Sequence, residues 1–146
     1  MGTFARKRIL VVEDDPTLQA ELVAALEGLG HTVVVAVHYD DVTRTLVDTR
    51  PHVVIVSLNL PRNSGYDVCE VIRGNERLAA TQILITSDRA TPAEFAFAEE
   101  AGANAFLRKP FTRPQLTKYL TALLDTKRPA RPSVRMLRRS DIPPSA

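Results

Sequence analysis

Five short apolar runs, each followed by a helical pattern, constrain the fold of this 146-residue chain more than any other feature. Most are continuous and rich in β-branched residues, as expected of strands buried on both faces. The runs are Ile9-Leu10-Val11-Val12, Thr32 to Val37, Val53-Val54-Ile55-Val56, Ile83-Leu84-Ile85 and Ala105-Phe106-Leu107. A βα unit repeated about five times predicts one α/β domain, in which a parallel central sheet carries helices on both faces.

Helix-start signals follow several of these strands. Asp15 is a good N-cap before Pro16, and Thr91 with Glu94 and Thr112 with Gln115 have the spacing of capping boxes. Further helices are expected over residues 39–49 and 67–73. These signals make the helices as well defined in the sequence as the strands between them.

The charge distribution changes near the end of the chain. Residues 1–125 contain thirteen basic and sixteen acidic side chains, whereas residues 126–146 contain six and one. The second range also has four prolines and little apolar periodicity. We therefore predict a folded domain over 1–125 and a basic, Pro-rich, disordered tail or linker over 126–146.

The basic tail allows two interpretations. Six cationic side chains could attract nucleic acid, an anionic membrane or an acidic partner, or they could belong to a solubilising linker. No helix-turn-helix or other nucleic-acid-binding pattern follows the domain, and this favours the linker. The six residues are Lys127, Arg128, Arg131, Arg135, Arg138 and Arg139.

Two features bear on the cellular location. No apolar run approaches the roughly 18–20 residues that span a bilayer, so no membrane insertion is expected. The single cysteine, Cys69, excludes an internal disulfide framework and is typical of the reducing cytoplasm. Cys69 is predicted to be a buried apolar residue and not a reactive thiol, because nothing basic is adjacent in the expected helix.

Polar residues follow the strands at the positions where an α/β sheet keeps its chemistry. In such a sheet, ligands lie outside the carboxyl ends of the strands. The residues placed there are Glu13, Asp14, Ser57, Thr86, Ser87, Arg108 and Lys109.

Taken in order, these residues resemble the receiver domains of two-component response regulators. The resemblance covers about residues 8–125. It includes the acidic pair after the first strand, Leu58-Asn59-Leu60-Pro61 and Gly65 after the third, and Lys109-Pro110-Phe111 after the fifth. It implies a flavodoxin-like (βα)5 fold with sheet order 2-1-3-4-5, and a cis bond between Lys109 and Pro110.

The resemblance also implies roles for the residues at the strand ends. Mg²⁺ would be held by Glu13, Asp14, the side chain at position 57 and the backbone carbonyl of Asn59. Lys109 would pair with a phosphoryl group, and the hydroxyl of Thr86 would bond to it. Phe106 occupies the position of the family's aromatic switch.

The departure from the family is Ser57, which stands where the phosphorylated aspartate should be. An aspartate is ionised at neutral pH and attacks phosphorus directly, whereas a serine hydroxyl needs a base. The three histidines, His31, His38 and His52, are expected at the opposite end of the sheet. The loss of the third carboxylate predicts Mg²⁺ binding that is weak or absent, and it lets Lys109 pair more completely with Glu13 or Asp14.

Three explanations of Ser57 remain open: a natural loss of phosphorylation, an engineered substitution in an ordinary receiver, or a serine phosphorylated by a separate kinase. A serine enzyme is not favoured, because the flanking glycines of a hydrolase elbow and a histidine–carboxylate pair are missing. Without an acceptor, Thr86 and Ser87 could simply be solvated residues at a strand end.

The sequence favours a receiver-like module, not an enzyme, that acts by binding partner proteins without aspartate phosphorylation. In the family, the face formed by the fourth helix, fifth strand and fifth helix binds effectors and forms dimers. The expected partners are therefore a sensor kinase, an effector or a second copy of the chain. That face would draw on Phe97, Ala98, Ala103, Phe106, Arg108, Arg113, Lys118 and Tyr119.

Overall fold

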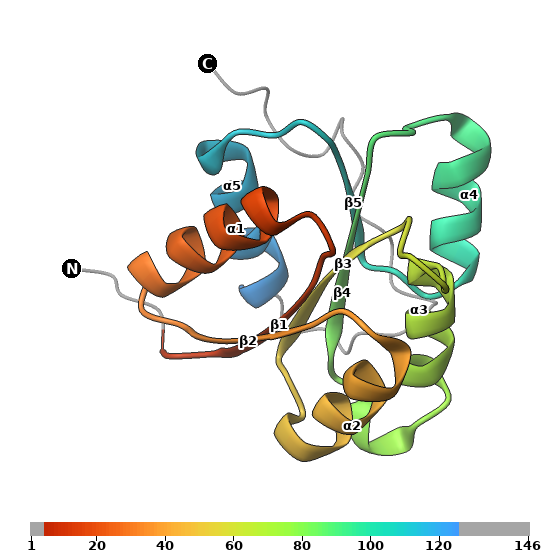
Figure 1. Ribbon diagram of the computed structural model, residues 1–146, viewed down its shortest axis with the longest axis horizontal. Helices are drawn as coiled ribbons and strands as arrows, with labels where there is room; N and C mark the ends of the chain where they lie inside the picture. Colours follow the sequence, from red (N-terminus) through yellow and green to blue (C-terminus); the bar gives the residue numbers. More distant parts are fainter. Residues whose placement is uncertain (1–4, 126–146) are drawn as a thin grey trace.

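The computed structural model describes residues 5–125, in which strands and helices alternate along the chain (Figure 1). The predicted tail, residues 126–146, lies outside the described residues. The elements are β1 (Arg8–Val12), α1 (Pro16–Gly28), β2 (Thr32–Ala36), α2 (Tyr39–Thr49), β3 (Val53–Ser57), α3 (Gly65–Arg73), the 3₁₀ turn η1 (Glu76–Leu78), β4 (Gln82–Ser87), α4 (Pro92–Glu100), β5 (Ala105–Arg108) and α5 (Arg113–Leu124).

The five strands form one parallel sheet in the order β2-β1-β3-β4-β5, which confirms the predicted fold class. The register pairs Val12 with Val56 and Ser57 with Thr86. Because the strands are parallel, their carboxyl ends lie at one edge of the sheet. This carboxyl edge brings together residues from four separate parts of the sequence.

Helices cover both faces of the sheet (Figure 1). Helices α1 and α5 lie on one face, and α2, α3 and α4 lie on the other. Two hydrophobic clusters fill the two interfaces, and residues alternate between them along each strand: Leu10 and Val12 face one cluster, and Ile9 and Val11 face the other. This explains why the strands read as continuous apolar runs in the sequence.

The helix starts are mostly as predicted. The side chain of Asp15 accepts a hydrogen bond from the backbone N–H of Thr17, and Thr112 forms the expected capping box with Gln115. At α4 only one of the two hydrogen bonds of the predicted capping box forms, so that prediction is wrong for the Glu94 side chain. Thr91 accepts from the backbone N–H of Glu94, but the Glu94 carboxylate accepts a hydrogen bond from the hydroxyl of Tyr66 on α3.

Two further features of the described residues concern one peptide bond and the length of the helices. The peptide bond between Lys109 and Pro110 is cis, as the family resemblance implied. Among residues 5–125, no helix is both long enough and apolar enough to cross a membrane.

Candidate functional site

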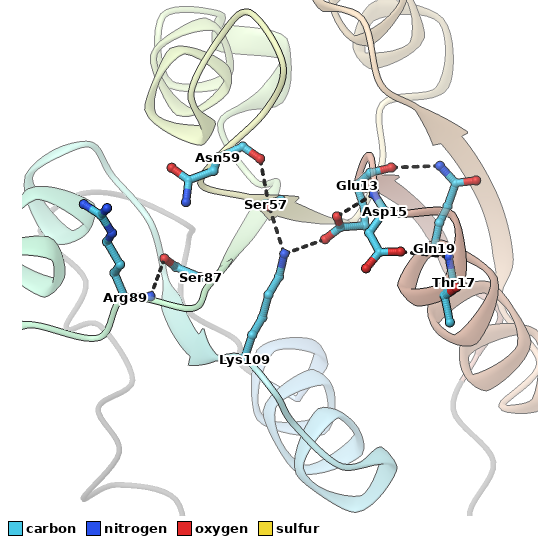
Figure 2. A network of polar contacts seen from close by, with 9 residues as sticks. All are labelled: Glu13, Asp15, Thr17, Gln19, Ser57, Asn59, Ser87, Arg89 and Lys109. Carbon is cyan, nitrogen blue, oxygen red and sulfur yellow. Dashed lines mark hydrogen bonds and ion pairs between the residues drawn. The ribbon is translucent and has the colours of Figure 1, made fainter.

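The carboxyl edge of the sheet gathers the polar residues that the sequence singled out. Glu13 follows β1 and Ser57 ends β3, while Thr86 and Ser87 end β4 and Lys109 follows β5. Figure 2 shows the side chain of Lys109 reaching across the edge, between Glu13 on one side and Ser57 on the other. The topology thus assembles residues up to 96 positions apart into one small site.

Lys109 is the centre of the network. Its Nζ lies 2.9 Å from Oε1 of Glu13 and donates a hydrogen bond of 3.1 Å to Oγ of Ser57. The Glu13 side chain is only 2% exposed and that of Lys109 only 22%. A buried carboxylate is costly without a counter-charge, and Lys109 supplies that charge. The prediction that Lys109 pairs with Glu13 or Asp14 is therefore confirmed for Glu13.

The remaining polar atoms of Glu13 are also engaged. Its Oε2 accepts a hydrogen bond from the backbone N–H of Asp15 at 3.0 Å. Its carbonyl oxygen accepts from Nε2 of Gln19 at 2.8 Å (Figure 2). The carboxylate is thus held in one orientation, directed at Lys109.

Ser57 is integrated into this network and not directed to solvent. It is 2% exposed, and its hydroxyl accepts from Lys109 while donating to the carbonyl oxygen of Asn59 at 3.3 Å. One short side chain therefore connects the ammonium group to the loop that follows β3. A base that could remove the Ser57 proton is not supplied by Lys109, because the ammonium group is the donor in this contact.

The predicted metal ligands lie close to the contacts of Lys109 and Ser57. Glu13 faces Lys109, the carbonyl of Asn59 accepts from Ser57, and Asp14 is exposed beside them. Within residues 5–125, no cluster of three or more His, Cys, Asp or Glu side chains could hold a metal ion. Mg²⁺ is commonly held by one or two carboxylates with waters completing its octahedral shell, so Glu13, Asp14 and the carbonyl of Asn59 are the groups that would hold it, although Glu13 is paired with Lys109 here.

Thr86 and Ser87 are not solvated residues. Thr86 is 1% exposed and Ser87 is 2% exposed, so the interpretation of both as solvated strand-end residues is wrong. Their burial follows from β4, which lies inside the sheet between β3 and β5. Oγ of Ser87 accepts from the backbone N–H of Arg89, which fixes the turn after the strand (Figure 2).

The predicted interaction face is only partly accessible. Phe97 is 59% exposed, and Arg108, Arg113 and Lys118 are exposed as well. The other predicted members belong to the two hydrophobic clusters and are buried: Ala98, Ala103, Phe106 and Tyr119. Phe106 lies inward, with its ring 6.3 Å from that of Phe95.

One prediction about the histidines is wrong. His31 and His52 do precede β2 and β3, but His38 follows β2 and is therefore at the same edge as Ser57. It lines a cavity of about 460 Å³ with Tyr39, Arg62 and Asn63, and Ser57 is not part of that lining. His38 is thus at the right edge of the sheet but in a different cavity.

The environment of Cys69 also differs in part from expectation. The thiol is fully buried, as predicted, and burial raises its pKa to about 12. A basic group is nearby after all, since Arg73 one turn later acts to lower that pKa, but burial dominates. The guanidinium of Arg73 donates to the carbonyl of Gly102 and to the side chain of Asn104.

No pattern in the sequence indicated a role for Tyr66. Its hydroxyl proton is shared between Oε2 of Glu94 at 2.7 Å, the closer acceptor, and the carbonyl oxygen of Glu94 at 3.2 Å, across 28 residues of sequence. Its ring lies 6.4 Å from that of Phe97. Burial, and then the hydrogen bond to Glu94, raise the pKa of the Tyr66 hydroxyl, so it stays protonated and remains a donor.

Comparison with known proteins agrees with this fold. The family model of the response regulator receiver domain matches residues 9–121, and the chain belongs to that family. Among curated proteins, PilG of Pseudomonas aeruginosa is 26% identical over 109 residues, which cover 75% of this chain and 81% of PilG. The DNA-binding response regulator MtrA of Mycolicibacterium smegmatis is 31% identical over 119 residues, covering 82% of this chain and 51% of MtrA. This chain thus matches about half the length of MtrA.

Solved structures give the same result. A putative response regulator from Chloroflexus aurantiacus has a TM-score of 0.78 at 26% identity, covering 84% of this chain and all of that one. The receiver domain of sensor histidine kinase PA1611 from Pseudomonas aeruginosa has a TM-score of 0.76 at 28% identity, with the same coverage. That structure has a magnesium ion coordinated in its active-site cleft.

Proposed function

We propose that this receiver domain is a pseudo-receiver, which signals by binding partner proteins without phosphorylation of an aspartate. The observation that carries the proposal is the contact network in which Lys109 bonds Ser57 and pairs with the buried Glu13. In this arrangement the chain's own ammonium group neutralises the site. No phosphoryl group is needed to bring Lys109 to the end of β3.

The chemistry of Ser57 supports the same conclusion. A neutral hydroxyl is a weak nucleophile unless a base accepts its proton. Ser57 instead donates to the carbonyl of Asn59 and accepts from a cation. We infer that the site performs no catalysis, and that any Mg²⁺ binding through Glu13, Asp14 and Asn59 is weak or absent.

The partners follow from the exposed part of the interaction face. Phe97 on α4 offers an exposed apolar anchor, and Arg108, Arg113 and Lys118 add exposed positive charge at β5 and α5. Such a surface fits a sensor kinase, an effector or a second copy of the chain in the cytoplasm. Arginine and aromatic side chains are common among the residues that contribute most to binding energy at interfaces.

A second candidate is an ordinary phosphoacceptor receiver in which serine has replaced the aspartate at position 57. Glu13, Asp14, Thr86 and Lys109 all stand where such a receiver needs them, and this favours it. The two candidates differ in what one substitution restores, since the second requires only Ser57→Asp.

The test is incubation of the natural chain, Ser57→Asp and Ser57→Asn with acetyl phosphate and Mg²⁺, followed by intact-mass measurement. Ser57→Asn is the matched control, because it has the shape of aspartate without a carboxylate. We expect no phosphoryl gain by the natural chain or by Ser57→Asn. A gain by Ser57→Asp alone would favour the second candidate, and no gain by any chain would favour a constitutive interaction module. A gain by the natural chain would refute the proposal.

A further inference from the structure

Tyr66 stands between the two parts of the molecule that matter for the proposed function. Its backbone belongs to the first turn of α3, directly after the loop that leaves Ser57. Its side chain reaches α4, where it bonds Glu94 and contacts the ring of Phe97. Phe97 is the most exposed large apolar side chain among residues 5–125.

The loop between Ser57 and Tyr66 is closed by short contacts along its whole length. Asn59, whose carbonyl accepts from Ser57, forms an antiparallel bridge with Ser64. The side chain of Ser64 accepts from the backbone N–H of Tyr66 at 3.0 Å. A change in the side chain at position 57 therefore acts on a loop that has little freedom to absorb it.

Gly65 makes this connection tighter. Its backbone N–H donates to the carbonyl of Leu58 at 2.8 Å. A Cβ atom at Gly65 would lie only 2.8 Å from the carbonyl oxygen of Ser57, so the start of α3 lies directly against the end of β3. Any displacement of Ser57 thus meets the backbone one residue before Tyr66.

On the α4 side, Tyr66 makes a short hydrogen bond to a charged acceptor. The Tyr66 hydroxyl donates to a carboxylate at 2.7 Å, and hydrogen bonds to charged acceptors are stronger than neutral ones. Glu94 lies in the first turn of α4, and the contact takes its carboxylate away from the capping box. The bond and the ring contact with Phe97 together join α4 to α3 at two points one turn apart.

We propose that Tyr66 is a positioning residue that couples the loop after Ser57 to the exposed surface of α4. The coupling runs through Asn59, Ser64 and Tyr66 to Glu94 and Phe97, and it does not involve Thr86 or Phe106. It rests on the proposed function in one respect, namely that the surface around Phe97 is where partners bind. The loop after Ser57 thus sets the position of α4, and α4 presents the surface that a partner protein would bind.

The first experiment measures the contact itself by hydrogen exchange of the full chain. Tyr66→Phe removes only the hydroxyl, and we expect amide exchange of residues 95–99 to rise about tenfold or more, with exchange in β3 unchanged. Glu94→Gln keeps an acceptor oxygen and should have a smaller effect. Tyr39→Phe is the matched control, because Tyr39 is an exposed tyrosine on α2, and it should leave α4 unchanged.

The second experiment measures the coupling by amide chemical shifts, with Ser57→Asp introduced into the natural chain and into Tyr66→Phe. We expect Ser57→Asp to shift the amide of Phe97, and Tyr66→Phe to remove at least half of that shift. Equal shifts in both backgrounds, or an α4 whose exchange stays within about twofold in Tyr66→Phe, would overturn the proposal. An equal rise of exchange in β3 and α4 would also overturn it, because the effect would then be global. None of these readouts depends on phosphoryl transfer, so they stand or fall separately from the proposed function.

Discussion

The two ends of the β-sheet both hold polar side chains in specific contacts, but the contacts differ in kind. At the carboxyl edge, the charges of Glu13 and Lys109 neutralise each other, with Ser57 beside them. At the amino edge, two histidines accept hydrogen bonds from consecutive backbone N–H groups through Nδ1. His31 accepts from Lys7 at 3.2 Å, and His52 accepts from Arg8 at 3.0 Å.

The difference matters because the two arrangements fail in different ways. A buried ion pair is costly to break by removing one partner, since the other charge remains buried. A histidine in this position destabilises the fold only when its ring becomes protonated, because Nδ1 then carries a proton and can no longer accept a hydrogen bond. Burial lowers the pKa of His31 and of His52, Lys7 lowers both further and Arg8 lowers that of His52, so both rings favour the neutral form. The stability of the carboxyl edge therefore depends on the presence of both charged side chains, whereas the stability of the amino edge depends on pH.

The largest effect should follow the loss of the cation at the carboxyl edge. Lys109→Met leaves the carboxylate of Glu13 buried without its counter-charge, and we expect a loss of about 3–5 kcal/mol in the free energy of unfolding. Urea unfolding measures it. Lys118→Met makes the same change at an exposed lysine and should stay within about 0.5 kcal/mol. A loss below about 1 kcal/mol for Lys109→Met would contradict the role of Lys109 as the counter-charge of Glu13.

A smaller effect should come from glycines near the two edges. Gly65→Ala places a methyl group 2.8 Å from the carbonyl oxygen of Ser57, and we expect a loss of about 1–3 kcal/mol as the backbone shifts. Gly28 near the amino edge has nothing within 4 Å of such a methyl group. Gly28→Ala should therefore be neutral or gain up to about 1 kcal/mol. Equal stabilities of the two variants in thermal unfolding would contradict the packing at Gly65.

The smallest effect should appear at the amino edge as pH falls. Because the pKa of each histidine is lowered on folding, the unfolded chain binds more protons, and stability decreases as pH drops below the unfolded value of about 6.5. Each bond lost should cost on the order of 1 kcal/mol. The measurement is the urea midpoint between about pH 7.5 and 5.5 for the natural chain and for His31→Gln with His52→Gln. The double variant should show a shallower slope, and identical slopes would show that the rings do not titrate.

Most of the fold could be predicted from the sequence, for reasons visible in particular residues. Strands buried on both faces must be apolar throughout, so runs such as Val53 to Val56 identify themselves. The site residues could be placed because parallel strands share one carboxyl edge. The contact of Lys109 with Glu13 also followed, since removing a carboxylate at position 57 leaves that ammonium group with fewer partners.

The rest depended on contacts that local patterns do not encode. Glu94 has the spacing of a capping box, and only the fold reveals that the hydroxyl of Tyr66, 28 residues earlier, takes its carboxylate. The edge at which His38 lies needed no such contact, because the apolar run from Thr32 to Val37 already ends before it and β2 ends at Ala36. The burial of Ala103, Phe106 and Tyr119 likewise depends on how α4 and α5 pack, which no periodicity in these short segments defines.

The burial of Cys69 gives the domain a built-in chemical reporter. It is the only cysteine in the chain, and it lies in the core between the sheet and the helices α2, α3 and α4. A thiol reagent can reach it only when that side of the domain opens. The rate at which a reagent labels this single sulfur atom therefore reports how often the layer that contains Tyr66 and Phe97 opens. No cysteine has to be introduced for the measurement.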